Sequence, residues 1–164
     1  MITILNDLQI GAERAMGTTL ASRQQLRTLL LEGFATLVEE VRGSQLLILG
    51  DLFDGPDIGY ADWLATFEIL YKFLGSGRRL TLVAGNHDLS KNSSVKSSFF
   101  VLGETLTLLH PDQCSVMYSP GWAAEGVYVI PHQVNQEAFD AALAEVPQCD
   151  ALLLHANYDN NFAK

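Results

Sequence analysis

The chain has 164 residues, 48% of them apolar and 18% charged, which is typical of one folded domain spanning residues 1–164 with a real core. No apolar run approaches the roughly 20 residues of a membrane-spanning helix, and the N-terminus has no basic flank, so we expect neither a membrane segment nor a signal peptide. The formal net charge of −9 argues against tight, sequence-independent binding of duplex DNA by this chain alone, because such binding depends on Lys and Arg.

Apolar runs alternate with helical periodicity along the first half of the chain. Apolar residues at offsets of three and four predict one helix from a cap at Thr18 or Thr19 to Gly43, and a second helix over residues 60–74. Short continuous apolar runs predict strands at residues 1–5, 46–49 and 79–84. A β-α-β order makes these strands parallel.

The second half of the chain is less regular. Residues 89–98 are polar and predict an exposed loop, and residues 99–109 predict a short helix followed by a strand. Strands are expected at 116–118 and 127–130, and the turn residues between them suggest a hairpin. The last elements expected are a helix at 136–146 and a strand at 151–154.

Polar residues stand at the carboxyl ends of four predicted strands. They are Asp7, Asp51, the run Asn86-His87-Asp88, and His155. Ligands of open α/β sheets bind at this edge, and carboxylate, amide and imidazole groups together suit manganese, magnesium, iron or zinc. The sequence therefore predicts a metal site there.

The chemistry expected of such a site is hydrolysis of a phosphate ester by two metal ions and a bridging hydroxide. Asp51 is the expected bridging ligand, with Asp7 on one side and Asn86 and His155 on the other. His87 is the expected general acid.

Simpler interpretations stand beside these assignments. Asp54 and Asp88 either orient histidines or act as turn and cap residues. Arg14 either contacts phosphate or lies solvated at the surface. His110 and His132 flank prolines and are expected to be loop residues, although His132 could face substrate.

The motifs Asp7-Leu8-Gln9, Gly50-Asp51-Leu52-Phe53-Asp54 and Gly85-Asn86-His87-Asp88, with the isolated His155, resemble those of the calcineurin-like metallophosphoesterases. Within that family they are most similar to the SbcD-type DNA nucleases, and similar phosphoesterases are encoded by tailed phages. The resemblance implies an α/β/β/α sandwich, a dinuclear metal centre, and hydrolysis of phosphomonoesters or phosphodiesters.

Two departures from the family pattern matter. Gln9 stands where the family usually has a histidine, and its carbonyl oxygen is a weaker ligand that favours hard ions such as manganese or magnesium. The late Gly-His-x-His motif is missing. We therefore expect a fold incomplete at the C-terminus, explained by a fragment, by a second polypeptide that completes the site, or by degeneration.

Three functions follow as hypotheses. The first is a manganese-dependent DNA exonuclease or endonuclease of SbcD type, for which an SbcC-like ATPase is a candidate partner. The second is a phosphoesterase of the same fold acting on small nucleotides or phosphoproteins, and the third is a catalytically degenerate scaffold that acts through a protein partner. Cys114 and Cys149 form no CxxC motif, which favours a cytoplasmic protein, in the host cytoplasm if phage-encoded.

Overall fold

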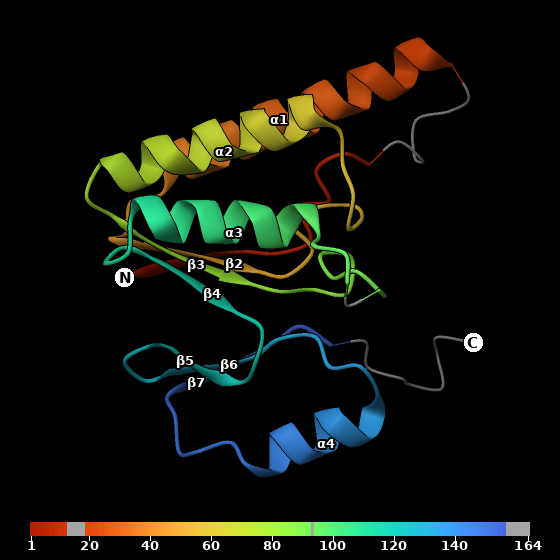
Figure 1. Cartoon of the computed structure of the whole chain (residues 1–164). Coiled ribbons are helices and arrows are strands. Elements are labelled where there is room, and N and C mark those ends of the chain that lie inside the picture. The colour runs from red at the N-terminus through yellow and green to blue at the C-terminus, as the bar shows by residue number, and fades with distance from the viewer. Residues whose placement is uncertain (13–18, 93, 157–164) are drawn as a thin grey trace.

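Two β-sheets stack between layers of helices in the computed structural model, which describes residues 1–12, 19–92 and 94–156 (Figure 1). The first sheet has the order β1 (Ile2–Leu5), β2 (Gln45–Leu49), β3 (Arg79–Val83) and β4 (Cys114–Met117). It is covered by helices α1 (Leu20–Glu40), α2 (Tyr60–Gly75) and α3 (Ser98–Leu109). The second sheet contains β5 (Gly121–Ala124), β6 (Val127–Ile130) and β7 (Ala151–Leu154), and α4 (Gln136–Ala144) lies on its far side. The predicted α/β/β/α sandwich is thus confirmed.

All four strands of the first sheet are parallel. Leu5 pairs with Ile48, and Leu49 pairs with Val83, so the ends of β1, β2 and β3 are nearly level. The loops that follow these strands therefore emerge at one edge of the sheet, where ligands of open α/β sheets bind.

Two apolar cores hold the layers together. The larger lies between the first sheet and its helices and includes Phe34, Phe73 and Phe99, each at most 2% exposed. The smaller lies between the two sheets, around the buried Leu47 and Val129. Because neighbouring strand residues point to opposite faces, β2 contributes Leu46 and Ile48 to the first core and Leu47 and Leu49 to the second. Burial on both faces explains why this strand is a continuous apolar run.

Helix boundaries follow local capping chemistry. The Thr19 side chain accepts a hydrogen bond from the Ser22 N–H and caps α1. The helix ends at Glu40, three residues before the expected end at Gly43, where any side chain would collide with the Met1 carbonyl. No helix among the described residues is both long and apolar enough to cross a membrane.

The structure corrects three expectations in the second half of the chain. Residues 99–109 contain no strand, because α3 runs from the Ser97 cap to Leu109. Residues 116–118 do not form a hairpin with 127–130, since β4 joins the first sheet and the hairpin pairs β5 with β6. The third correction concerns β7, which pairs in parallel with β6. The four polar strand ends therefore come from two sheets and not from one edge.

Candidate metal centre

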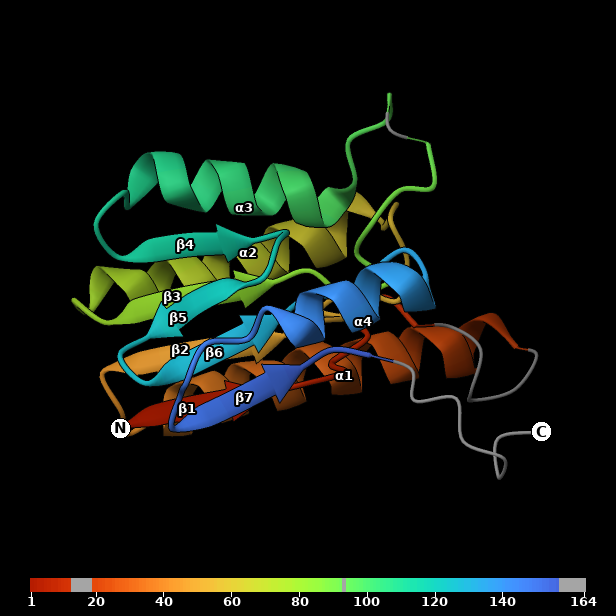
Figure 2. The same ribbon diagram turned by 90° about the horizontal axis from the view of Figure 1, so that it is seen from below.

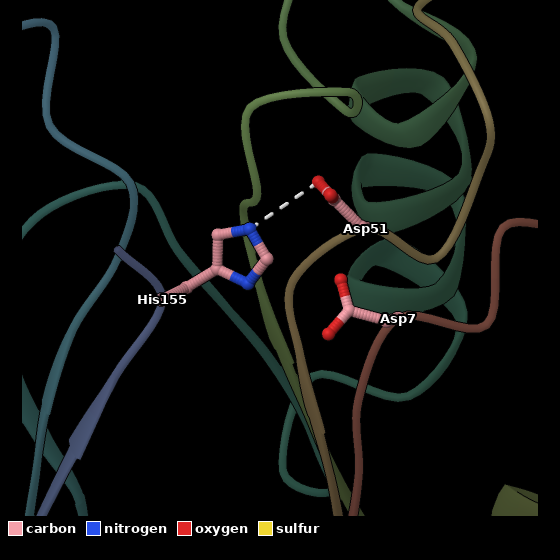
Figure 3. Close-up of side chains that lie close together, drawn as sticks. All are labelled: Asp7, Asp51 and His155. Carbon is pink, nitrogen blue, oxygen red and sulfur yellow. Dashed lines mark ion pairs between the residues drawn. The ribbon is translucent and has the colours of Figure 1, made fainter. Parts of the chain in front are cut away.

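Asp7, Asp51 and His155 converge between the two sheets (Figure 3). One ligand atom from each side chain lies within 4.8 Å of the others. Asp7 is exposed, whereas Asp51 and His155 are 4% and 8% exposed. The cluster therefore has a buried floor and one side open to solvent.

The backbone at this edge is strained at three of the predicted ligands. Asp7, Gln9 and Asp51 have φ angles of 52°, 46° and 49°, and no other non-glycine residue in the described segments has a positive φ. Such left-handed conformations cost about 1–3 kcal/mol each and concentrate at functional sites. The N–H of Gln9 donates to the Asp51 carbonyl at 2.9 Å, and that of Ile10 donates to the Leu52 carbonyl at 2.9 Å. These bonds hold the loops after β1 and β2 against each other.

His155 reaches this edge from the second sheet. Its N–H donates to the Ile130 carbonyl at 3.0 Å, which extends the pairing of β6 with β7 by one residue. Its ring fits against Gly50, where a Cβ atom would collide with the imidazole. Gly85 fits against Asp51 in the same way. These two glycines let both ligands approach the backbone of the first sheet closely.

Hydrogen bonding fixes the proton arrangement of the His155 ring. Nδ1 lies 2.9 Å from the Leu49 carbonyl oxygen, and a carbonyl oxygen only accepts, so Nδ1 carries a proton. Nε2 lies 3.4 Å from Asp51 Oδ1 and 3.2 Å from Asn86 Oδ1. An unprotonated Nε2 would direct its lone pair toward these acceptor oxygens, and only a cation, a proton or a metal ion, makes that arrangement favourable.

This arrangement fits a divalent metal ion. A metal-binding histidine typically donates its other ring N–H to a carbonyl or carboxylate, as His155 does to Leu49. Two carboxylates, an amide oxygen and an imidazole nitrogen form a donor set suited to manganese, iron, zinc or magnesium.

The electrostatics of the pair follow from the same contacts. Contact with Asp51 raises the pKa of His155 above its usual value, although burial opposes this shift. Burial raises the pKa of Asp51, but contacts with His155 and with the His87 N–H lower it by more, so this pKa lies below its usual value. At neutral pH Asp51 is therefore an anion, as a metal ligand requires.

His87 lies next to the cluster and is oriented by the loop after β2. Its backbone N–H donates to Asp51 Oδ1 at 3.0 Å. Its Nδ1 lies 2.6 Å from the Asp54 carbonyl oxygen and must be the donor, because that oxygen only accepts. Nε2 is then the nitrogen of His87 that can exchange a proton with another group. Asp54 thus orients a histidine, which was one of the two interpretations of this residue. It does so through its backbone carbonyl and not through its carboxylate.

Asp88 is fully buried beneath the site and contacts backbone instead of histidine side chains. Its carboxylate accepts hydrogen bonds from the N–H groups of Gly85 at 2.9 Å, Phe53 at 3.1 Å and Leu52 at 3.4 Å. Burial raises the pKa of Asp88 to about 6, even though these bonds favour the charged form. Asp88 therefore joins the loops after β2 and β3, which carry Asp51 and Asn86.

The remaining predicted residues stand as follows. The backbone of Gln9 is tied to Asp51, and its role as a ligand stays a prediction. Arg14 lies outside the described residues. His132 is a loop residue after β6, as expected, and its N–H donates to the Ala84 carbonyl at 3.1 Å. Burial and the charge of His155 lower its pKa. The sequence analysis allowed that His132 could face substrate, and the rule that selected His155, a polar residue after a strand, also applies to His132 after β6.

The fold and the cluster together define an α/β protein with a candidate metal site at the carboxyl ends of its strands. The family model for calcineurin-like phosphoesterases matches residues 1–158, so the chain belongs to the calcineurin-like phosphoesterase family. The crystal structure of the Pseudomonas putida nuclease MPE is similar to this chain at 20% sequence identity and a TM-score of 0.46. The match covers 82% of this chain and 55% of that nuclease, so this chain spans about half of its length. No curated protein sequence matches the chain.

Proposed function

We propose that the protein is a metal-dependent phosphodiesterase that cleaves nucleic acid, with DNA as the substrate of an SbcD-type activity. The observation that carries the proposal is the convergence of Asp7, Asp51 and His155, whose ligand atoms lie within 4.8 Å of one another. Membership of the calcineurin-like phosphoesterase family supports phosphoester hydrolysis. The Gly-Asp-Leu-Phe-Asp and Gly-Asn-His-Asp motifs support the narrower assignment to nucleases.

The proposed cofactor is a pair of divalent ions, manganese first among them, held by Asp7, Asp51, Asn86 and His155 with Gln9 as a further ligand. When bound, such ions stabilise the charge of the reacting phosphate and activate water. The four side chains supply mostly oxygen donors, which suit manganese and magnesium better than they suit soft metals.

The side chains around the metal position have separate tasks in this proposal. Asp51 supplies a permanent negative charge beneath the phosphate, and the His155 proton on Nδ1 keeps that ring facing Asp51. His87, anchored through Nδ1 to the Asp54 carbonyl, would give a proton from Nε2 to the leaving oxygen. Asp88 keeps the two ligand-bearing loops in register.

The proposal includes a partner. The five side chains named above provide fewer donors than two metal ions require, so further ligands would come from a C-terminal fragment or another polypeptide. An SbcC-like ATPase is the proposed partner for cleavage of long DNA, because the net charge of −9 weakens DNA binding by this chain alone. The proposed location of this activity is the cytoplasm. The same charge favours the second candidate, a phosphoesterase for small nucleotides or phosphoproteins.

Two matched variants test the proposal. Asp51→Asn removes the buried charge, whereas Asp57→Asn makes the same change at an exposed position of the same loop. We expect calorimetry to detect manganese binding and manganese-stimulated hydrolysis of bis-p-nitrophenyl phosphate in wild type and Asp57→Asn. In Asp51→Asn, hydrolysis should fall by about 100-fold or more.

The outcomes separate the candidates. Linear DNA cleaved faster than the small diester favours the nuclease, and the reverse favours the small-substrate enzyme. A wild-type chain that binds no manganese, even with a Gly-His-x-His segment of a family member added in trans, contradicts both and leaves the degenerate scaffold.

A further inference from the structure

A cleft of 210 Å³ lies beside the metal cluster, lined by residues 132–136, Phe139 and Ala156. Ala156 directly follows the ligand His155. The opposite wall is the segment from the end of β6 into α4, and α4 extends past the ends of β6 and β7 (Figure 2). The cleft is thus open to the same edge of the fold as the metal cluster.

His132 lies between the cleft and the cluster. Its N–H donates to the Ala84 carbonyl, just before Gly85 and Asn86 in the β3 loop. Burial and the charge of His155 lower the pKa of His132, while Asp51 raises it, so the ring is within electrostatic reach of both residues. A molecule with its phosphate at the cluster would therefore extend past His132 into the cleft.

The cleft wall has few charged side chains for so acidic a protein. Apart from the imidazole of His132, none of its described lining residues is acidic or basic, although the chain has a net charge of −9. The Gln133 amide nitrogen donates to the Pro131 carbonyl and the Gln136 amide nitrogen donates to Asp140, so both amide oxygens are left as acceptors. Phe139 adds a half-buried aromatic ring. This combination suits an uncharged, planar group that both stacks and donates hydrogen bonds.

The size of the cleft narrows the choice of ligand. Pockets that hold a whole drug-sized ligand measure about 300–1,000 Å³, so a 210 Å³ cleft accommodates one group of a larger molecule. Nucleobases are planar, uncharged, stack on aromatic rings and present N–H donors.

We propose that this cleft is a nucleobase subsite, in which Phe139 and His132 contact the base of a nucleotide whose phosphate lies at the metal cluster. The proposal rests on the proposed function, and it makes both residues determinants of specificity.

Two esters with the same leaving group test this subsite. The p-nitrophenyl ester of thymidine 5′-monophosphate carries a base, and methyl p-nitrophenyl phosphate does not. In each, a water oxygen forms a bond to phosphorus while the bond to p-nitrophenolate breaks. Wild type should prefer the thymidine ester in kcat/KM by about tenfold or more, the effect of one base-stacking platform. Phe139→Leu and His132→Ala should each lower this preference several-fold.

Phe100→Leu is the matched control, because Phe100 is half-buried in a separate cleft beside Lys96 and Tyr118. It should leave the preference unchanged. Circular dichroism checks that each variant folds. If Phe139→Leu has lost helical structure, the preference measured for His132→Ala determines whether the subsite is accepted. Calorimetry of thymidine 5′-monophosphate without added metal gives a second measurement, with weaker binding expected in Phe139→Leu than in Phe100→Leu.

The results distinguish the two proposals. Equal kcat/KM for both esters, unchanged by the variants, overturns the subsite and leaves the phosphodiesterase intact. If neither ester is hydrolysed while nucleotide binding weakens only in the cleft variants, the subsite stands and the phosphodiesterase fails. If all variants bind the nucleotide equally, the subsite is rejected.

Discussion

Replacing Gly50 with alanine tests the position of His155, on which the candidate metal centre depends. A Cβ atom at Gly50 would lie 2.5 Å from His155 Cγ and 2.7 Å from Cε1, whereas carbon atoms pack best at about 3.5–4.0 Å. The imidazole must therefore move, which breaks its hydrogen bond to the Leu49 carbonyl and separates it from Asp51.

The structure supplies a control that isolates the steric effect. Gly50 has a φ of 79° and Gly77 has a φ of 82°, so alanine is strained at both positions by about 1 kcal/mol. A Cβ atom at Gly77 meets nothing within 4 Å. Gly77→Ala therefore introduces backbone strain alone.

We expect Gly77→Ala to lower the free energy of unfolding by about 1 kcal/mol, and Gly50→Ala to lower it by about 2 kcal/mol, because Gly50→Ala also loses a hydrogen bond. Manganese affinity should fall by about tenfold or more in Gly50→Ala, which displaces one ligand, and stay at the wild-type value in Gly77→Ala. Urea denaturation measures the first quantity and calorimetry the second. If Gly50→Ala binds manganese as wild type does and is no less stable than Gly77→Ala, His155 does not lie against Gly50, and the site is wrongly placed.

Two further predictions concern charged groups. Burial raises the pKa of Asp88 from 3.8 to about 6, so the folded state binds this proton more tightly than the unfolded state, and the contribution of Asp88 to stability rises as the pH falls. Between about pH 7 and pH 4 the gain from Asp88 should be about 2 kcal/mol in metal-free protein, and urea denaturation should show a smaller rise in Asp88→Asn. Arg27→Met removes the ion pair that Arg27 makes at 2.6 Å with Asp62, whose side chain is 6% exposed, and should lower the free energy of unfolding by about 2–3 kcal/mol. Lys72→Met breaks an exposed pair with Glu39 and should lower it by less than about 0.5 kcal/mol in the same assay. Equal costs for these two variants would contradict the buried position of Asp62.

The first sheet could be predicted from the sequence because local pattern and burial agree there. Each of β1, β2 and β3 is a short apolar run that ends at a polar residue, and parallel strands place such ends at one edge. Asp7, Asp51 and Asn86 were found by that rule, and the structure places them around the same edge. The family resemblance rested on the same motifs and is confirmed by the match over residues 1–158.

The second sheet could not be predicted in the same way. The run Gly121-Trp122-Ala123-Ala124 has no alternation that marks a strand, and its pairing with β6 depends on tertiary contacts. Four apolar residues at β7 identify a strand but not its neighbour, so the sequence analysis expected His155 at the same edge as the other polar residues, and only the pairing with β6 assigns it to the second sheet. The role of Asp88 was equally hidden, since its three partners are backbone N–H groups that a sequence motif does not name.

The strained backbone at the site explains how two sheets can share one set of ligands. A chain that continued straight from β2 would carry Asp51 away from β7, whereas the positive φ angles of Gly50 and Asp51 turn it back toward His155. The backbone bonds of Gln9 and Ile10 and the three bonds to Asp88 hold these turns, so the strain is balanced by the loops themselves. The donors carried by the loops after β1, β2 and β7 are thus held close together by backbone contacts.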